Sequence, residues 1–211
     1  MAQTLLDLKT RILALLNDTD GGTYVAAVQL SAAQAAIRQI IEYYPKLVRS
    51  AVLTLSADFE ATLPTDAYMV DAVLDVKSNK YLPKAGLSAG SYAGESIETN
   101  DWHQYQSGLV TFSRDAEDGV RIFYRALYAE PSVDVDVLET PDLLFNMLGY
   151  WGAAEALIGR ASSTANIRQF NVKVDSGTPD HNPLKQMAKE YQVLYHNSAK
   201  TLPDIEVPSV V

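Results

Sequence analysis

Apolar positions recur at helical spacing in the first part of the chain. One stripe predicts a helix over Leu5–Leu16, which begins at a capping box formed by Thr4 and Asp7. A second stripe predicts a helix over Ser31–Tyr44, which ends at Pro45 because proline cannot continue a helix. The two helices are expected to form an antiparallel hairpin. Their stripes consist of Leu5, Leu8, Ile12 and Leu15, and of Ala33, Ile37, Ile40, Ile41 and Tyr44.

Helical spacing returns toward the C-terminus. Thr140-Pro141 predicts a helix start, since proline is favoured directly after an N-cap. Asn182-Pro183 repeats this pair and predicts a final helix over Pro183–Lys200. Between them, Ala161–Asn182 is expected to be a linker with a candidate short strand over Asn171–Val174. The expected seams are Leu144, Leu148, Trp151 and Ile158 in the first helix, and Leu184, Met187, Tyr191, Leu194 and Ser198 in the second.

Three glycines fall inside the first of these C-terminal helices: Gly149, Gly152 and Gly159. Each costs about 1 kcal/mol relative to alanine in a free helix. We therefore expect them to serve the close approach of another helix, and the alternative is that the helix merely tolerates them.

The middle of the chain has the period of strands, with short apolar runs separated by turn residues. In the last run, alternate residues from Val120 to Tyr128 share one face. Lys84–Ser107 is rich in Gly and Ser, and we expect a long loop there with a short helix near Asp101–Tyr105. The candidate strands are Val48–Leu55, Phe59–Leu63, Tyr68–Val76, Lys80–Leu82, Leu109–Phe112 and Val120–Tyr128.

Together these patterns predict an α+β fold. Two N-terminal and two C-terminal helices are expected to form a four-helix bundle, into which an antiparallel β-lobe is inserted. The expected divisions are residues 1–46 for the N-terminal helical hairpin, 47–139 for the β-rich insert, 140–200 for the C-terminal helices, and 201–211 for an extended C-terminal arm.

Composition excludes several classes of function. The chain has 26 acidic and 17 basic residues, a net charge of −9 and a pI near 4.7, whereas nucleic-acid binders normally carry a basic footprint. It holds no cysteine, which excludes disulfide scaffolds, cysteine–zinc sites and thiol catalysis. No apolar run approaches the roughly 20 residues of a membrane span, and no basic stretch of a signal peptide opens the chain. We expect a soluble protein made in a cytoplasm, without a membrane partner.

The acidic excess is local. Residues 127–160 contain six acids and a single base, Arg160, while the rest of the chain is nearly balanced. Asp134 and Asp136 alternate with valines, which fits the solvated face of an extended segment better than a metal cluster. The excess is explained either by solubility or by a wall that repels a polyanion. The candidate wall residues are Glu130, Asp134, Asp136, Glu139 and Asp142.

Candidate catalytic chemistry is weak. Gly86-Leu87-Ser88-Ala89-Gly90 matches the nucleophile-elbow pattern, but that motif needs a strand before it and a helix after it. Here Pro83 precedes it closely and more loop residues follow. The three histidines, His103, His181 and His196, lack metal-ligand spacing. No catalytic residue, metal site or cofactor is predicted, and a serine hydrolase at Ser88 stays as an alternative.

The C-terminal segment mixes apolar residues with prolines and acids, and it is too short to form a core of its own. As an arm it would add a strand to the sheet edge of another subunit or fill a groove; as a free tail it would fray. The candidate contact residues of the arm are Leu202, Pro203, Ile205, Val207, Pro208, Val210 and Val211.

The chain resembles the adaptor proteins of tailed bacteriophages, also called head–tail connector or head-completion proteins. The resemblance is carried by the helix pair Leu5–Leu16 and Ser31–Tyr44, and by the patterns from Trp102 to Phe112, from Gly119 to Tyr124, and from Pro141 into Leu148-Gly149-Tyr150-Trp151-Gly152-Ala153-Ala154. It spans roughly Leu5 to Lys200.

The resemblance implies a structural virion protein of the neck, made in the host cytoplasm. Such proteins form a ring, usually of twelve copies, beneath the portal protein, and they receive the next tail or neck protein at the other end. It implies that Pro183–Lys200 and the arm face the portal, that the helices build the ring, and that the loop of the β-lobe faces the tail or the exterior. Genomic DNA would pass through the ring without sequence-specific binding. A tail terminator or another tail-tube component, usually hexameric, is the nearest alternative.

Overall fold

The computed structural model describes residues 2–84, 101–106, 108–113, 118–168 and 182–203. Within them, four α-helices and antiparallel sheets give the predicted α+β class. The chain divides into a helical unit, Met1–Tyr44 with Tyr128–Asp204, and a β unit that contains Pro45–Leu127. The predicted bundle arrangement, domain divisions and C-terminal arm stay predictions.

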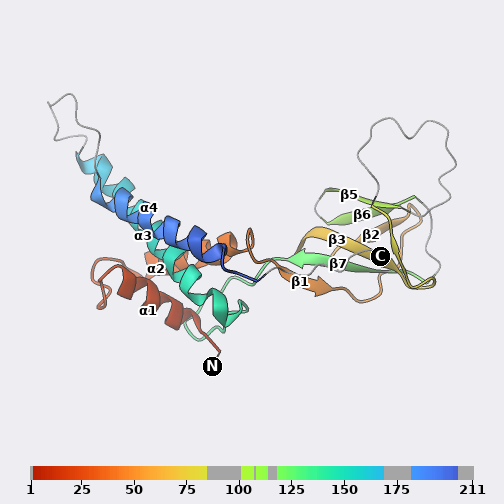
Figure 1. The fold of residues 1–211 in the computed structure, drawn as a ribbon, viewed down its shortest axis with the longest axis horizontal. Coiled ribbons are helices and arrows are strands. Elements are labelled where there is room, and N and C mark those ends of the chain that lie inside the picture. The colour runs from red at the N-terminus through yellow and green to blue at the C-terminus, as the bar shows by residue number, and fades with distance from the viewer. Residues whose placement is uncertain (1, 85–100, 107, 114–117, 169–181, 204–211) are drawn as a thin grey trace. The chain divides into compact units, whose positions relative to one another are not determined.

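The helical unit is built around its longest helix, α3, which packs against each of the other three α-helices. No helix in the described part of the chain combines the length and apolar content that crossing a bilayer requires. The elements are α1 (Leu5–Leu15), α2 (Ala26–Ile40), a short 3₁₀ helix η1 (Asp142–Leu144), α3 (Phe145–Arg168) and α4 (Pro183–Ala199), as Figure 1 shows.

Two predicted helix starts are confirmed by their hydrogen bonds. The Thr4 N–H donates to the Asp7 carboxylate at 2.9 Å, and the Asp7 N–H donates to the Thr4 hydroxyl at 3.3 Å, which completes the capping box of α1. At α4, the Leu184 N–H donates to the Asn182 side chain at 3.0 Å. Pro183 stands at the start of that helix, where a missing N–H costs no bond.

Other predicted helix boundaries are wrong. Helix α2 begins at Ala26, not at Ser31, because the alanine-rich stretch before Ser31 propagates a helix well without a side-chain cap. It ends at Ile40, short of Tyr44. The helix predicted to start at Thr140-Pro141 starts later. Pro141 is the N-cap of the short helix η1, and α3 begins after η1, at Phe145.

The expected linker after residue 160 is also shorter than predicted. Helix α3 continues to Arg168. The Ser162 hydroxyl donates to the carbonyl of Ile158, and the Ser163 hydroxyl donates to that of Arg160, so both polar side chains are satisfied inside the helix. The candidate strand at 171–174 lies outside the described residues.

Two of the three glycines serve close helix packing, as predicted. A Cβ atom at Gly152 would lie 2.4 Å from the Cδ1 atom of Ile12 in α1. One at Gly149 would lie 2.9 Å from the Arg11 Cγ atom. Nothing lies within 4 Å of such an atom at Gly159, which α3 therefore merely tolerates.

The seam predicted for α4 is wrong in part. Ala188 and Tyr195 are its buried residues, and the Tyr195 hydroxyl donates to the Gln39 carbonyl at 3.2 Å. Burial raises the pKa of Tyr195. Met187 and Leu194 are exposed. Leu184 and Tyr191 of the predicted seam do pack against the core. Ala188 and Tyr195 take the places predicted for Met187 and Leu194, one residue further along, because the neighbouring helices decide which side of α4 leaves water.

The first helix and the start of α3 supply most of the large aliphatic core. Leu144 and Leu148 are fully buried, as the predicted seam requires. Trp151 is only half-buried and packs against Tyr195 at 4.9 Å between ring centroids, while Ile158 is exposed. Helix α3 remains in the core beyond these positions, because Leu157 and Ala161 are buried, so the second half of the predicted seam is wrong.

The β unit consists of two antiparallel sheets, of strand order β1-β7-β3-β4 and β2-β6-β5, that share one apolar core. In β7, alternate residues from Val120 to Ala126 are buried, as the predicted face requires. Gly119, with φ +79°, closes the turn before β7. The strands are β1 (Lys46–Arg49), β2 (Glu60–Thr62), β3 (Ala67–Asp75), β4 (Lys80–Leu82), β5 (Trp102–Gln106), β6 (Leu109–Phe112) and β7 (Val120–Ala126).

Two predictions in the β unit are wrong. The expected short helix near Asp101–Tyr105 is strand β5, because Trp102 is buried in the core and its indole N–H donates to the Leu82 carbonyl at 3.0 Å. The first strand ends at Arg49, and after it only Leu53 forms a bridge, to Val120.

Candidate functional site

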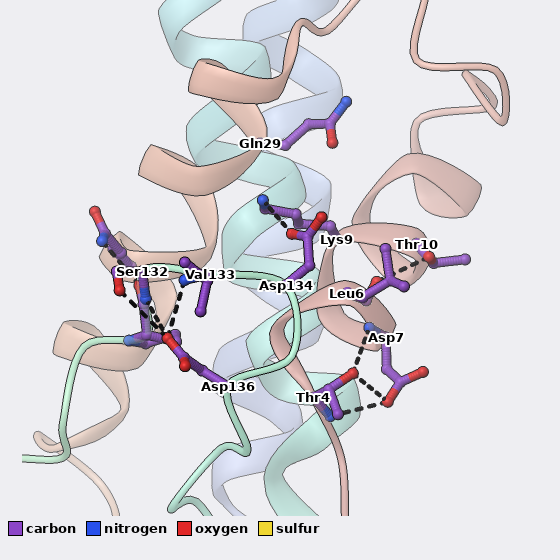
Figure 2. A network of polar contacts seen from close by, with 12 residues as sticks. Thr4, Leu6, Asp7, Lys9, Thr10, Gln29, Ser132, Val133, Asp134 and Asp136 are labelled. Atoms are coloured by element: carbon purple, nitrogen blue, oxygen red, sulfur yellow. Dashed lines mark hydrogen bonds and ion pairs between the residues drawn. The ribbon is translucent and has the colours of Figure 1, made fainter.

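Four of the predicted acidic residues lie on an irregular segment that leads to η1, and the fifth, Asp142, begins η1 itself. The segment was predicted to be extended, but it turns at residues 133–136, and its residues 132–137 are hydrogen-bonded to the start of α1. The first N–H groups of a helix lack intrahelical partners. Here the Leu5 N–H donates to the Asp136 carbonyl at 2.9 Å, and the Leu6 N–H donates to the Asp134 carbonyl at 3.1 Å. Residues 132–137, called the valine segment below, thus supply hydrogen-bond acceptors to the free N–H groups at the N-terminus of α1 (Figure 2).

Asp136 folds the valine segment into a fixed turn. Its carboxylate accepts the Ser132 N–H at 2.7 Å and the Val133 N–H at 2.9 Å, as Figure 2 shows. The Val133 N–H, and then that of Ser132, lower the pKa of the Asp136 carboxyl, because they stabilise its charged form. The shape of this segment is therefore set by its own hydrogen bonds.

Asp134 in the valine segment and Glu130 just before it each form an ion pair with a residue of a helix. The Lys9 ammonium lies 2.7 Å from the Asp134 carboxylate, and the Arg38 guanidinium donates to both Glu130 oxygens at 3.0 Å. The Glu139 carboxylate accepts the Ala129 N–H at 3.1 Å. These acids therefore have local structural roles, which the sequence alone did not indicate.

The valines between these acids are exposed to solvent. The exposed fractions are 53% for Val133, 80% for Val135 and 59% for Val137, and Leu6 of α1 beside them is 53% exposed. A loop that only needed to be soluble would carry polar residues at these positions. Apolar side chains that are held exposed on a backbone of fixed shape favour a contact with another protein. We call Leu6 and the three valines the valine face.

A second exposed apolar surface runs along α4. Met187, Val193 and Leu194 are 40%, 56% and 44% exposed, and we call them the α4 face. Val193 and Leu194, with Gln186, Lys189 and Glu190, line a shallow hollow. The sequence signal for this face was present, but Met187 and Leu194 were assigned to the core.

The comparison with protein families identifies the class of protein. A family described as SU10 adaptor protein matches residues 3–178. The chain belongs to this family. Its members are phage adaptor proteins, which supports a structural role in the tail or neck of a virion and a non-catalytic one. No curated protein matches the chain.

The structure describes only the start of the predicted arm of this adaptor. Leu202 is half-buried and packs against the core of the helical unit, whereas Pro203 is exposed. The other candidate arm residues, Ile205, Val207, Pro208, Val210 and Val211, lie outside the described residues, and so do Gly86–Gly90 with Ser88.

His103 and His196, the histidines within the described ranges of the adaptor, belong to different units. His103 lies in β5, and His181 is outside the described residues. His196 at the end of α4 has its Nδ1 atom 2.8 Å from the Tyr43 hydroxyl, beside Trp151. Within the described ranges, no group of three potential metal ligands occurs.

Asp18 lies in the loop that follows α1. Its carboxylate accepts the N–H groups of Thr23 and Tyr24, so its role is structural.

Proposed function

We propose that this adaptor forms a ring between the portal and the next tail or neck protein of a tailed phage, and that the ring continues the DNA channel. Twelve is the expected number of copies. The observation that carries the proposal is the family match over residues 3–178. The fixed, exposed apolar surfaces of the helical unit support it, because surfaces of this kind are stabilised by contact with another protein.

Mass measurement of the purified adaptor, alone and with its portal ring, tests this function. We expect a closed ring that co-purifies with the portal. A protein that stays monomeric in both conditions contradicts the proposal. A hexamer would favour the tail terminator, for which the two-sheet core of the β unit is the supporting observation.

For the C-terminal arm, we propose contact with the portal. Because Leu202 packs on the helical core, the deletion that tests the arm should begin after Pro203. Removing residues 204–211 is expected to leave the fold intact and to weaken binding to the portal. Removing residues 202–211 is the matched comparison, and it is expected to destabilise the helical unit as well. Unchanged portal binding after the shorter deletion would contradict the role of the arm.

The acidic residues Glu130, Asp134, Asp136, Glu139 and Asp142 are proposed to face the channel. Twelve copies of net charge −9 would carry about −108, and a lining of that sign repels DNA rather than holding it. The ion pairs of Asp134 and Glu130 reduce this effect locally. The charge map of an assembled ring tests the placement, and a basic channel would contradict it.

A further inference from the structure

The valine face and the α4 face belong to the same compact unit but to different sides of it. Helix α1, next to the valine face, packs on α3 at Gly149 and Gly152. Helix α4 lies along the other margin of the helical unit in Figure 1. One copy therefore presents two separate apolar surfaces, neither covered by any part of the chain that the structure describes.

The two faces match in chemistry. Both are made of aliphatic side chains and Met, which need no hydrogen-bond partner when they are buried. Aliphatic surface of this kind is stabilised by about 25 cal/mol for each Å² that leaves water. A contact between them would therefore leave no side-chain donor or acceptor of either face unsatisfied.

The charges around the two faces are opposite. Five carboxylates lie between Glu130 and Asp142, and two of them are paired, with Lys9 and Arg38. From Pro183 to Lys200 there are three lysines and a single acid, Glu190. Lys185 and Lys189 on α4 are exposed and form no ion pair within the described residues. Opposite charge at the rim of a contact directs orientation and raises the association rate.

The valine face is also prepared for binding. Its backbone is held by the hydrogen bonds to Leu5 and Leu6, and the Asp136 carboxylate fixes its turn. Little conformational entropy is then lost on contact, which favours affinity.

We propose that the valine face of one adaptor copy docks against the α4 face of the next copy. This inference rests on the proposed ring and names the contact that builds it. Because the two faces differ, the contact is heterologous: each new copy offers a free face to another, and a closed ring results when the rotation returns to the start. In this contact the carboxylates of residues 130–142 lie at the rim near the lysines of α4, a placement that competes with the channel-facing one, and the charge map of an assembled ring decides between the two.

Cross-linking tests the contact cleanly, because the natural chain has no cysteine. One preparation carries Val135→Cys, a second carries Leu194→Cys, and the two are mixed with the portal ring and treated with a short bismaleimide. We expect cross-linked pairs from the mixture and little product from either preparation alone. A chain that carries both substitutions should give a ladder of covalent oligomers.

The matched control replaces Leu194→Cys with Val25→Cys. Val25 is 59% exposed and belongs to the same helical unit, but to neither face. We expect no ladder from Val135→Cys with Val25→Cys. Equal yields from the control, or dimers from Leu194→Cys alone, would overturn the inference, since the first means random collision and the second means a symmetric contact.

A complementation assay gives the second readout. Val135→Asp and Leu194→Asp each place a charge in one face at an exposed position, so both proteins should fold, as circular dichroism would check. Each alone should associate at least about tenfold more weakly than the natural chain, a loss of about 1.4 kcal/mol. Mixed together they should form dimers but not rings, because each retains one intact face.

The outcomes separate this inference from the proposed function. If the natural chain forms rings and both aspartate variants form them equally well, the contact is wrong and the ring stands. If the natural chain forms no ring with or without the portal, the proposed function fails, and the contact fails with it.

Discussion

The helical unit and the β unit bury their apolar residues in different ways. Of the seventeen exposed large hydrophobic residues in the described chain, twelve belong to the helical unit, which is also the larger of the two, and five to the β unit. In the β unit, two sheets face one another and bury their inner faces together. In the helical unit, α1 and α4 each bury one side and leave apolar residues on the other. The β unit thus buries the inner faces of its sheets against each other, whereas the helical unit leaves apolar residues on the outer sides of α1 and α4, where another protein can contact them.

The largest expected effect comes from the tryptophan of the β unit. Trp102 is 1% exposed and its indole N–H has a buried partner, so Trp102→Ala should lower the free energy of unfolding by about 3–5 kcal/mol. Trp151 in the helical unit is half-buried, so Trp151→Ala should cost clearly less than Trp102→Ala. Urea unfolding followed by circular dichroism measures both. Equal losses would mean that the helical unit is packed as tightly around Trp151 as the β unit is around Trp102.

Helix packing in the helical unit can be tested with two glycines of α3. Gly152→Ala places a methyl group against Ile12, and overpacking of about 1–3 kcal/mol should outweigh the roughly 1 kcal/mol that alanine gains in a helix. Gly159→Ala meets nothing and should stabilise by up to about 1 kcal/mol. Thermal unfolding of the two variants should therefore shift in opposite directions. A shift in the same direction would contradict the close approach of α1 and α3.

The capping box of α1 should contribute less. Thr4→Ala removes the acceptor of the Asp7 N–H and should cost about 1 kcal/mol in urea unfolding. Thr10→Ala is a suitable control, because the Thr10 hydroxyl donates only to the Leu6 carbonyl within the same helix. A loss no larger than that of the control would mean that the valine segment alone holds the α1 terminus.

A pH dependence follows from Asp136. Backbone N–H groups lower its pKa in the folded state, so its charge stabilises the fold above the unfolded pKa of about 3.9. That contribution is lost as the pH falls through the lower folded pKa. Natural protein and Asp136→Asn should thus differ in stability at pH 7 and converge under acid conditions. A difference that is independent of pH would exclude the carboxylate charge as its cause.

The smallest effect on stability is expected at the valine face. Val135→Ser removes a side chain that is 80% exposed and should change the free energy of unfolding by less than about 0.5 kcal/mol. The same variant should weaken assembly in a mass measurement. A large loss of stability would mean that Val135 is covered within the monomer, and the contrast between the two units would weaken.

How far the sequence predicts this fold depends on the range of the interactions. The caps at Thr4 and Asn182 involve groups within three residues of one another, and both were predicted from residue types alone. The buried face of β7 follows from simple alternation. Strand β5 was missed although its partner β6 follows directly at Leu109, because the burial of Trp102 against the Leu82 carbonyl depends on a segment twenty residues away.

The valine face could likewise be predicted only in part, because it depends on contacts between residues far apart in the sequence. The alternation of acids and valines from Val133 to Val137 was visible, and it was interpreted as a solvated segment. Nothing in the sequence indicated that Lys9 and Arg38 would pair with acids more than ninety residues away. Because Asp134 is paired with Lys9 and Asp136 accepts backbone N–H groups, the valines are the part of the segment left for a partner.

The sequence by itself determined the α+β class, the helix starts at α1 and α4, and the inner face of β7, since each rests on local hydrogen bonds or on a period of a few residues. The packing of distant elements determines that Ala188 and Tyr195, rather than Met187 and Leu194, are buried in α4, and that the valines are exposed beside the N-terminus of α1. The physical reason is that a periodic pattern defines faces, while the elements packed around a helix or segment decide which face leaves water.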